Sequence, residues 1–141
     1  MFCVSEGTLT LNGKGIINGL GKNDWNMAIW AKDNGKIVIN DGYFTNLGAS
    51  SVEDSAHFDL IYASGNAQIE INGGEFKCET PKWILNIKDK DRATANIVVK
   101  GGKFHGFNPA KCDTEGLNTN FVAPGYKVVE ESTDVFVVMP E

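Results

Sequence analysis

The chain contains an internal repeat, and this repeat limits its fold more than any other feature of the sequence. Three segments align without a gap: residues 37–44 (IVINDGYF), 69–76 (IEINGGEF) and 97–104 (IVVKGGKF). A weaker copy, residues 9–16 (LTLNGKGI), precedes them and has its second glycine displaced by one position. The spacing of about thirty residues is typical of a repeat architecture.

Each copy reads as strand, tight bend, strand. Two aliphatic residues separated by one position indicate a strand with one buried face, and a Gly one or two positions after Asn or Lys permits the backbone angles of a bend. A further short apolar strand is predicted before each of the last three copies, at residues 27–30, 58–62 and 83–87. No segment shows the sustained 3.6-residue period of a helix.

These observations predict an all-β fold, a short parallel β-helix of about four coils with three short strands each, over residues 1–104. Equivalent residues of successive coils then stack about 4.8 Å apart. The predicted inward columns are Leu11, Ile39, Ile71 and Val99, and Ile16, Phe44, Phe76 and Phe104. A ladder of Asn12, Asn40 and Asn72 is expected at the bend, with left-handed backbone angles and hydrogen bonds along the stack. Lys100 interrupts it, so the last bend should be looser.

A sandwich of antiparallel hairpins is the alternative all-β reading, since it also uses many short strands at regular spacing. Such hairpins do not require matched residues thirty positions apart, whereas a β-helix does. The longest variable segment, residues 45–57, is expected to project as a loop from one side of the stack.

The last part of the chain, residues 105–141, has a different pattern. An irregular loop over 105–120 precedes two predicted strands, 126–130 and 135–139, which form a hairpin. The end of a β-helix leaves open strand edges, so this region is expected to be a C-terminal cap. Only residues 1–6 precede the first coil, so that end should be poorly covered. Either the chain is part of a longer one or a partner closes this end.

Charge and composition exclude several functions. The net charge of −5, with Arg92 as the single arginine, argues against a nucleic-acid partner. No apolar run is long enough for membrane insertion. Cys3, Cys78 and Cys112 lack metal-ligand spacing and indicate free thiols from a reducing compartment. We therefore expect neither metal nor cofactor.

Three motifs carry a family resemblance: residues 97–104 with the KGGKF bend, 107–109 (FNP) and 119–128 (TNFVAPGYKV). Together they resemble a domain of virion proteins of tailed phages from gut bacteria, closely over residues 97–139. The resemblance implies a non-catalytic structural or adhesin module of a tail spike, tail fibre or head fibre, with a right-handed β-helix. It also implies a homotrimer in contact with other virion proteins or a host surface glycan. The expected location is the virion, assembled in the host cytoplasm.

Two other function classes stay open, a glycan-processing β-helix enzyme and an extracellular or cell-surface carbohydrate-binding module of bacteria. Clustered carboxylates are expected of such an enzyme. The acidic pairs here, such as residues 53–54, 89 with 91, and 130–131, lie in loops and turns. His105 and Gly106 match the His-Gly pair of polygalacturonases, but the other signatures of those enzymes are absent, so no catalytic residue is assigned.

Aromatic residues are the better candidates for binding, because they stack on sugar rings or fill a partner surface. The candidate ligand-binding residues are Trp25, Tyr43, Asp59 and Tyr62. Asp59 alternates with apolar neighbours, so it is expected to face solvent beside the 45–57 loop. Trp30 and Trp83 lie in apolar strands and are expected in the core or at a trimer interface.

Overall fold

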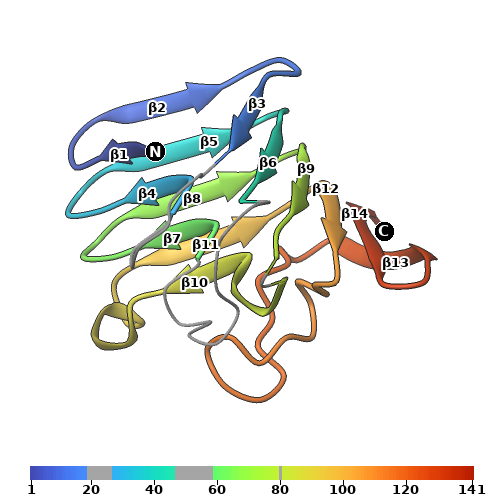
Figure 1. The fold of residues 1–141 in the computed structure, drawn as a ribbon. Coiled ribbons are helices and arrows are strands. Elements are labelled where there is room, and N and C mark those ends of the chain that lie inside the picture. The colour runs from blue at the N-terminus through green and yellow to red at the C-terminus, as the bar shows by residue number, and fades with distance from the viewer. Residues whose placement is uncertain (19–26, 47–58, 80) are drawn as a thin grey trace.

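The computed structural model describes residues 1–18, 27–46, 59–79 and 81–141, and its architecture is all-β (Figure 1). Three sheets enclose one core. The first sheet contains β1 (Phe2–Val4), β4 (Ile29–Ala31), β7 (Ile61–Ala63) and β10 (Leu85–Ile87). The second contains β2 (Thr8–Leu11), β5 (Lys36–Ile39), β8 (Gln68–Ile71) and β11 (Asn96–Val99). The third contains β3 (Ile16–Asn18), β6 (Tyr43–Thr45), β9 (Glu75–Lys77) and β12 (Gly102–His105), followed by β14 (Val135–Pro140) and β13 (Tyr126–Ser132).

Each sequence repeat contributes one strand to each sheet, and equivalent strands of successive repeats pair in parallel from β1 to β12. This parallel pairing excludes the antiparallel sandwich. The strands β4, β7 and β10 begin two or three residues later than predicted, and β1 was not predicted at all. Its sequence, Phe-Cys-Val, is too short to show an alternating pattern without the neighbouring strand.

The predicted aliphatic column lies in the second sheet. Leu11, Ile39, Ile71 and Val99 are in register across β2, β5, β8 and β11. The last three are fully buried, whereas Leu11 is half-buried because β2 has no neighbour on its other side among the described strands. Parallel register therefore places side chains of one type above one another.

The phenylalanine column lies in the third sheet. Phe76 stacks on Phe44 and Phe104 with ring centroids 5.0 Å and 4.7 Å away, and all three rings are completely buried. The prediction of Ile16 as its first member is wrong: Ile17 pairs with Phe44, while Ile16 pairs with Tyr43 and is 74% exposed. The first bend holds one extra residue, which shifts the inward position by one.

The asparagine ladder is present at the bend between the second and third sheets. Asn40 Nδ2 donates to Asn12 Oδ1 at 2.8 Å, and Asn72 Nδ2 donates to Asn40 Oδ1 at 2.9 Å. The expected left-handed angles are wrong for these asparagines; the following glycines, such as Gly42 at φ 133° and Gly74 at φ 101°, adopt positive φ instead.

The expectation of a looser last bend is also wrong. The amide of Lys100 donates to Ile71 O at 2.7 Å, the same distance as from the amide of Asn72 to Ile39 O. Lys100 Nζ contacts Glu70 Oε2 at 3.0 Å, and hydrogen bonds from Asn72 and Lys100 lower the pKa of Glu70. The backbone bonds hold the bend without an asparagine because they do not depend on the side chain.

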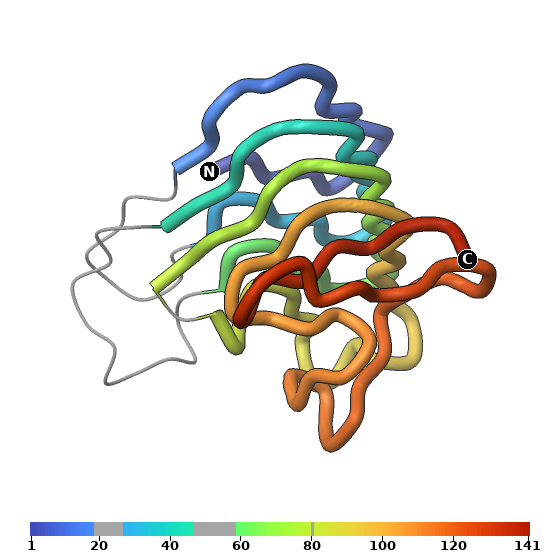
Figure 2. The backbone as a smooth tube through the Cα atoms, turned by 90° about the vertical axis from the view of Figure 1, so that its right-hand side faces the viewer, coloured from blue at the N-terminus to red at the C-terminus, as the bar shows by residue number. Residues whose placement is uncertain are grey.

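The C-terminal hairpin extends the third sheet: β14 pairs antiparallel with β12, and β13 pairs with β14. Residues 121–123 lie along β11, with the Val99 amide donating to Phe121 O and the Ala123 amide to Val99 O, both at 2.9 Å. Figure 2 shows the hairpin at the opposite end of the stack from β2 and β3. The C-terminal region thus covers the last strands of two sheets.

The opposite end exposes apolar side chains, as expected. Phe2 and Ile16 are 47% and 74% exposed, and Leu9 and Ile17 are half-buried. The three cysteines are free. None of the helices in the described ranges could cross a bilayer. The predicted loop at 45–57 lies outside the described residues, apart from its first two.

Candidate ligand-binding site

A cleft of about 610 Å³ lies on the outer face of the first sheet, at its β10 end. It is bounded by β7, by β10, by the 3-10 helices η2 (Pro81–Trp83) and η3 (Asp89–Asp91), and by the loop after β12. The lining residues combine aromatic, amide and charged side chains: Asp59, Tyr62, Trp83, Asn86, Ile87, Lys88, Asp89, Lys90, Arg92 and Thr114. Small-molecule sites typically combine apolar walls with a few placed polar groups in this way.

The alternation of the strands places one row of side chains on this outer face. Trp30, Tyr62 and Asn86 are in register across β4, β7 and β10, while their strand neighbours point into the core. The Trp30 and Tyr62 rings are 6.2 Å apart and tilted by 53°, and the Trp30 indole N–H donates to Ser64 Oγ at 2.9 Å. Trp30 is therefore half-buried on the sheet surface rather than in the core.

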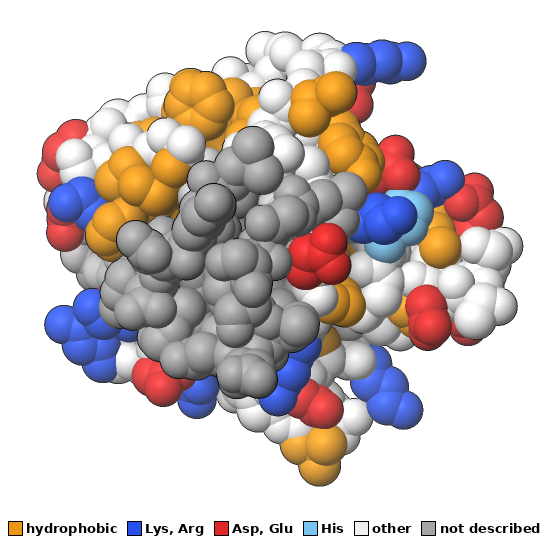
Figure 3. Space-filling model, in the orientation of Figure 1, with side chains coloured by type: hydrophobic (Ala, Val, Ile, Leu, Met, Phe, Trp, Pro, Cys, Tyr) orange, Lys and Arg blue, Asp and Glu red, His pale blue; other side chains and the backbone are white. Residues whose placement is uncertain are grey.

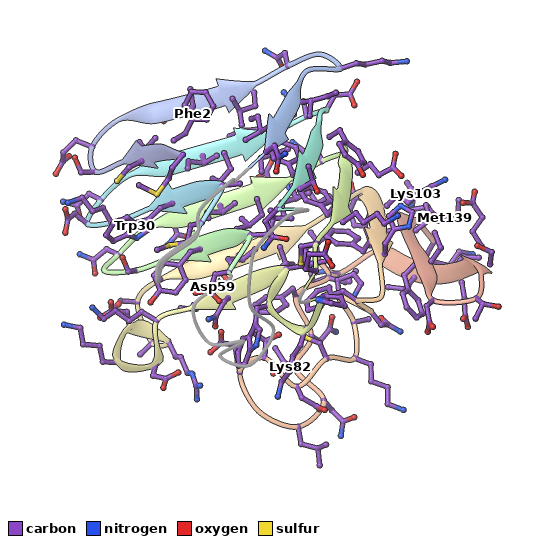
Figure 4. The ribbon with its side chains drawn as sticks, in the orientation of Figure 1. Phe2, Trp30, Asp59, Lys82, Lys103 and Met139 are labelled. Atoms are coloured by element: carbon purple, nitrogen blue, oxygen red, sulfur yellow. The ribbon has the colours of Figure 1, made fainter. Side chains whose placement is uncertain are left out.

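The prediction that the Asp59 carboxylate faces solvent is wrong. It is only 3% exposed, and its Oδ1 accepts a hydrogen bond from Asn86 Nδ2 at 2.8 Å. Figure 4 shows Asp59 on the same side of the molecule as Trp30. A buried carboxylate needs hydrogen-bond partners, and the neighbouring strand supplies one.

The loop after β12 builds the other wall. Glu115 Oε1 accepts the amide of Ile87 at 2.6 Å, and Oε2 lies 2.6 Å from Arg92 Nε. Arg92 also contacts Asp89 at 2.8 Å. Asp91 Oδ2 accepts the Gly65 amide at 2.8 Å. This network fixes the cleft wall, because each of these carboxylates holds a backbone amide or the guanidinium.

The pKa of Tyr62 reflects its burial and the negative charges around the cleft. Burial, followed by the charges of Asp59, Asp89, Asp91 and Glu115, raises the pKa of Tyr62 from 10.0 to about 12. Both causes disfavour the charged phenolate. The hydroxyl therefore stays protonated and can both donate and accept a hydrogen bond.

This pKa shift leads to a pH-dependent prediction. The pKa of Tyr62 is higher in the folded than in the unfolded chain, so between pH 10 and about 12 the unfolded chain holds fewer protons. The contribution of Tyr62 to stability should be complete below pH 10 and be lost as the pH rises through about 12. Denaturant unfolding across this range measures it, with Tyr62→Phe as the comparison. An equal loss of stability with rising pH in both proteins would contradict the prediction.

The structure describes three of the four predicted ligand residues and divides them between two places. Asp59 and Tyr62 meet in the cleft, whereas Tyr43 lies in a shallow groove of about 370 Å³ on the third sheet, beside Lys14, Glu75 and Lys103. Trp25 lies outside the described residues. The groove and the cleft are on different sheets, so Tyr43 does not share a site with Asp59.

Most of the residues that line or hold the cleft were not predicted as ligand candidates, among them Trp83, Asn86 and Glu115. Trp83 was assigned to a strand but forms the end of η2, half-buried, with Lys82 Nζ 5.0 Å from its ring centroid. Asn86 alternates with two apolar residues on a predicted strand, which was the available signal. Glu115 lies in an irregular loop and offered none.

His105 does not lie in the cleft. It belongs to β12 in the third sheet, and its Nε2 is 2.6 Å from Glu75 Oε1. Figure 3 shows charged side chains gathered at the C-terminal hairpin end of the third sheet, whereas apolar side chains are exposed over the first strands. Within the described ranges, no three His, Cys, Asp or Glu side chains are grouped as a metal site.

Comparison with known proteins found no matching family model, no similar curated protein and no similar solved structure.

Proposed function

We propose that this chain is a right-handed parallel β-helix module of a phage tail or head fibre or spike, and that it attaches the virion to a host surface glycan. The parallel pairing of equivalent strands in three sheets supports the β-helix. The resemblance of residues 97–139 to phage virion domains supports the virion assignment. Parallel strands that stack over several repeats make a rigid rod, which suits a fibre.

The cleft on the first sheet is the observation that carries the attachment role. It places the half-buried indole of Trp83 beside the side chains of Tyr62 and Asn86. A flat aromatic face packs against the C–H face of a sugar, while amide and hydroxyl groups exchange hydrogen bonds with its hydroxyls. This combination favours a glycan as the ligand.

The hydrogen bonds of the carboxylates favour binding over catalysis. A glycosidase needs one carboxylic acid to protonate the leaving group and a second carboxylate as nucleophile or base. In the cleft, Asp89 and Glu115 contact Arg92, and Asp59 contacts Asn86. These contacts hold the carboxylates as structural acceptors rather than as a catalytic pair.

We expect the purified chain to bind the surface of some gut bacteria and to leave their polysaccharide intact. Fluorescently labelled protein incubated with a panel of strains measures binding, and reducing-end release from the purified polysaccharide measures cleavage. Antibody labelling of virions in negative stain locates the chain. Release of reducing ends would support a glycan-processing enzyme instead. If the protein binds none of the strains, or if the antibody does not label the virions, the proposal is overturned.

A homotrimer belongs to the same proposal. The exposed apolar residues of the third sheet and hairpin, such as Ile16, Val129 and Met139, are suitable for contacts between side-by-side chains. Threefold closure hides such faces without leaving a polymerising edge. Light scattering should give three times the chain mass of 15.3 kDa. A stable particle of the single-chain mass would remove the trimer from the proposal.

A further inference from the structure

We propose that the cleft selects an uncharged, hydroxyl-bearing sugar through the side-chain amide of Asn86, which Asp59 holds in one orientation. The inference rests on the proposed attachment function and specifies the chemistry of the ligand.

The first step concerns the orientation of the amide. Asp59 is 3% exposed, and its carboxylate can only accept hydrogen bonds when ionised. Its Oδ1 lies 2.8 Å from Asn86 Nδ2, so the NH₂ group of Asn86, and not its carbonyl, faces the carboxylate. A flipped amide would place two acceptors against each other in a buried position, which costs the desolvation penalty of both groups. Asp59 is therefore a positioning residue.

The second step concerns what the amide leaves for a ligand. Asn86 is half-buried on the outer face, and within the described ranges no protein group bonds its carbonyl oxygen or its second N–H. The oriented side chain thus offers the cleft one acceptor and one donor. A sugar hydroxyl both donates and accepts, so it matches this pair. A carboxylate or sulfate only accepts, and an ammonium group only donates.

The third step concerns charge. Arg92 is already held by Asp89 and Glu115, so its charge is compensated within the protein. Burial raises the pKa of Tyr62 most, and the surrounding carboxylates raise it further because they disfavour a second negative charge at that position. Lys88 and Lys90 line the rim, where Lys90 is exposed and solvent ions screen it. An anionic sugar would place its charge next to these carboxylates.

The test uses the full chain and measures binding to immobilised mannan, dextran and galactan as neutral probes, and to polygalacturonate and hyaluronate as acidic probes. We expect at least one neutral probe to bind and to compete with binding to bacterial cells. Binding to acidic probes alone, or to no probe, would overturn the inference. If cell binding persists in either case, the proposed function stands without this inference.

Variants test the role of the amide. Asn86→Ala and Asn86→Asp should weaken binding of the neutral probe at least about tenfold, since each removes a hydrogen-bond donor of the cleft. Asn96→Ala, an exposed asparagine on the outer face of β11, is the matched control and should bind as the unaltered chain does. Equal binding by Asn86→Ala and Asn96→Ala would overturn the inference.

Asp59 is tested through conservative rescue. Asp59→Asn keeps an acceptor for the Asn86 amide and should retain most of the binding, whereas Asp59→Leu removes the acceptor and should lose at least about tenfold. Thermal unfolding is recorded for each variant. If Asp59→Leu fails to fold, the comparison of neutral and acidic probes on the unaltered chain decides the question. Full binding by a folded Asp59→Leu would contradict the positioning role.

Discussion

Phe76→Ala should lower the free energy of unfolding by about 3 to 5 kcal/mol, because it removes a fully buried ring and leaves a cavity. The ring is the middle of the phenylalanine column, with neighbours at 5.0 Å and 4.7 Å on its two sides. Neither neighbour can close the gap without leaving its own strand register. Chemical denaturation of the two proteins measures the difference.

Two further substitutions serve as comparisons for Phe76. Phe44→Ala should cost less, because the next member towards the open end is Ile17, which is only half-buried. Phe2→Ala removes a side chain that is 47% exposed and should cost least. Small and equal losses for Phe76 and Phe2 would show that the column does not stabilise the fold.

Gly101→Ala should lower the free energy of unfolding by about 3 kcal/mol, since it overpacks a site closed by backbone atoms. A Cβ at this position would overlap the carbonyl oxygen of Asn72 in the bend of the preceding repeat. The obstacle is main chain and cannot rotate away as a side chain could. The bend would have to separate from its neighbour, which breaks the hydrogen bond from the Lys100 amide to Ile71 O.

Gly15→Ala is the matched control for Gly101. It also lies in a bend, but a Cβ there meets no atom within 4 Å, and its φ is not positive. We expect its stability to change by no more than about 0.5 kcal/mol. A loss at Gly15 as large as that at Gly101 would mean that the cost arises from the bend conformation and not from close stacking of the repeats.

Much of the parallel arrangement could be predicted from the repeat alone. A residue type that recurs every thirty positions on strands of period two must occupy the same face each time, and parallel pairing then stacks it. For this reason the Ile39, Ile71 and Val99 column and the Asn40 to Asn72 ladder could be named in advance. The hairpin was also predictable, because its two strands alternate around a polar turn.

A second polar ladder was missed. Asn66 Nδ2 donates to Asn34 Oδ1 at 3.2 Å, and Asn34 Nδ2 donates to Glu6 Oε1 at 3.1 Å. These residues lie outside the aligned segments, so no motif marked them. They are neighbours only because of the register between the paired strands of the first two sheets.

The sequence by itself determined the repeat, its strand alternation and the residues that stack, since these depend on local periodicity. Only the tertiary structure decided the cleft. Asp59 and Asn86 are 27 residues apart, and Ile87 and Glu115 are 28 apart, yet each pair is joined by a hydrogen bond. Asp59 and Asn86 meet because β7 and β10 are neighbouring strands. Ile87 and Glu115 meet because the irregular loop after β12 folds back on β10. Ile17 replaced Ile16 for a similar reason: one extra residue in a bend changes which side chain reaches the core, and only packing against Phe44 selects between them.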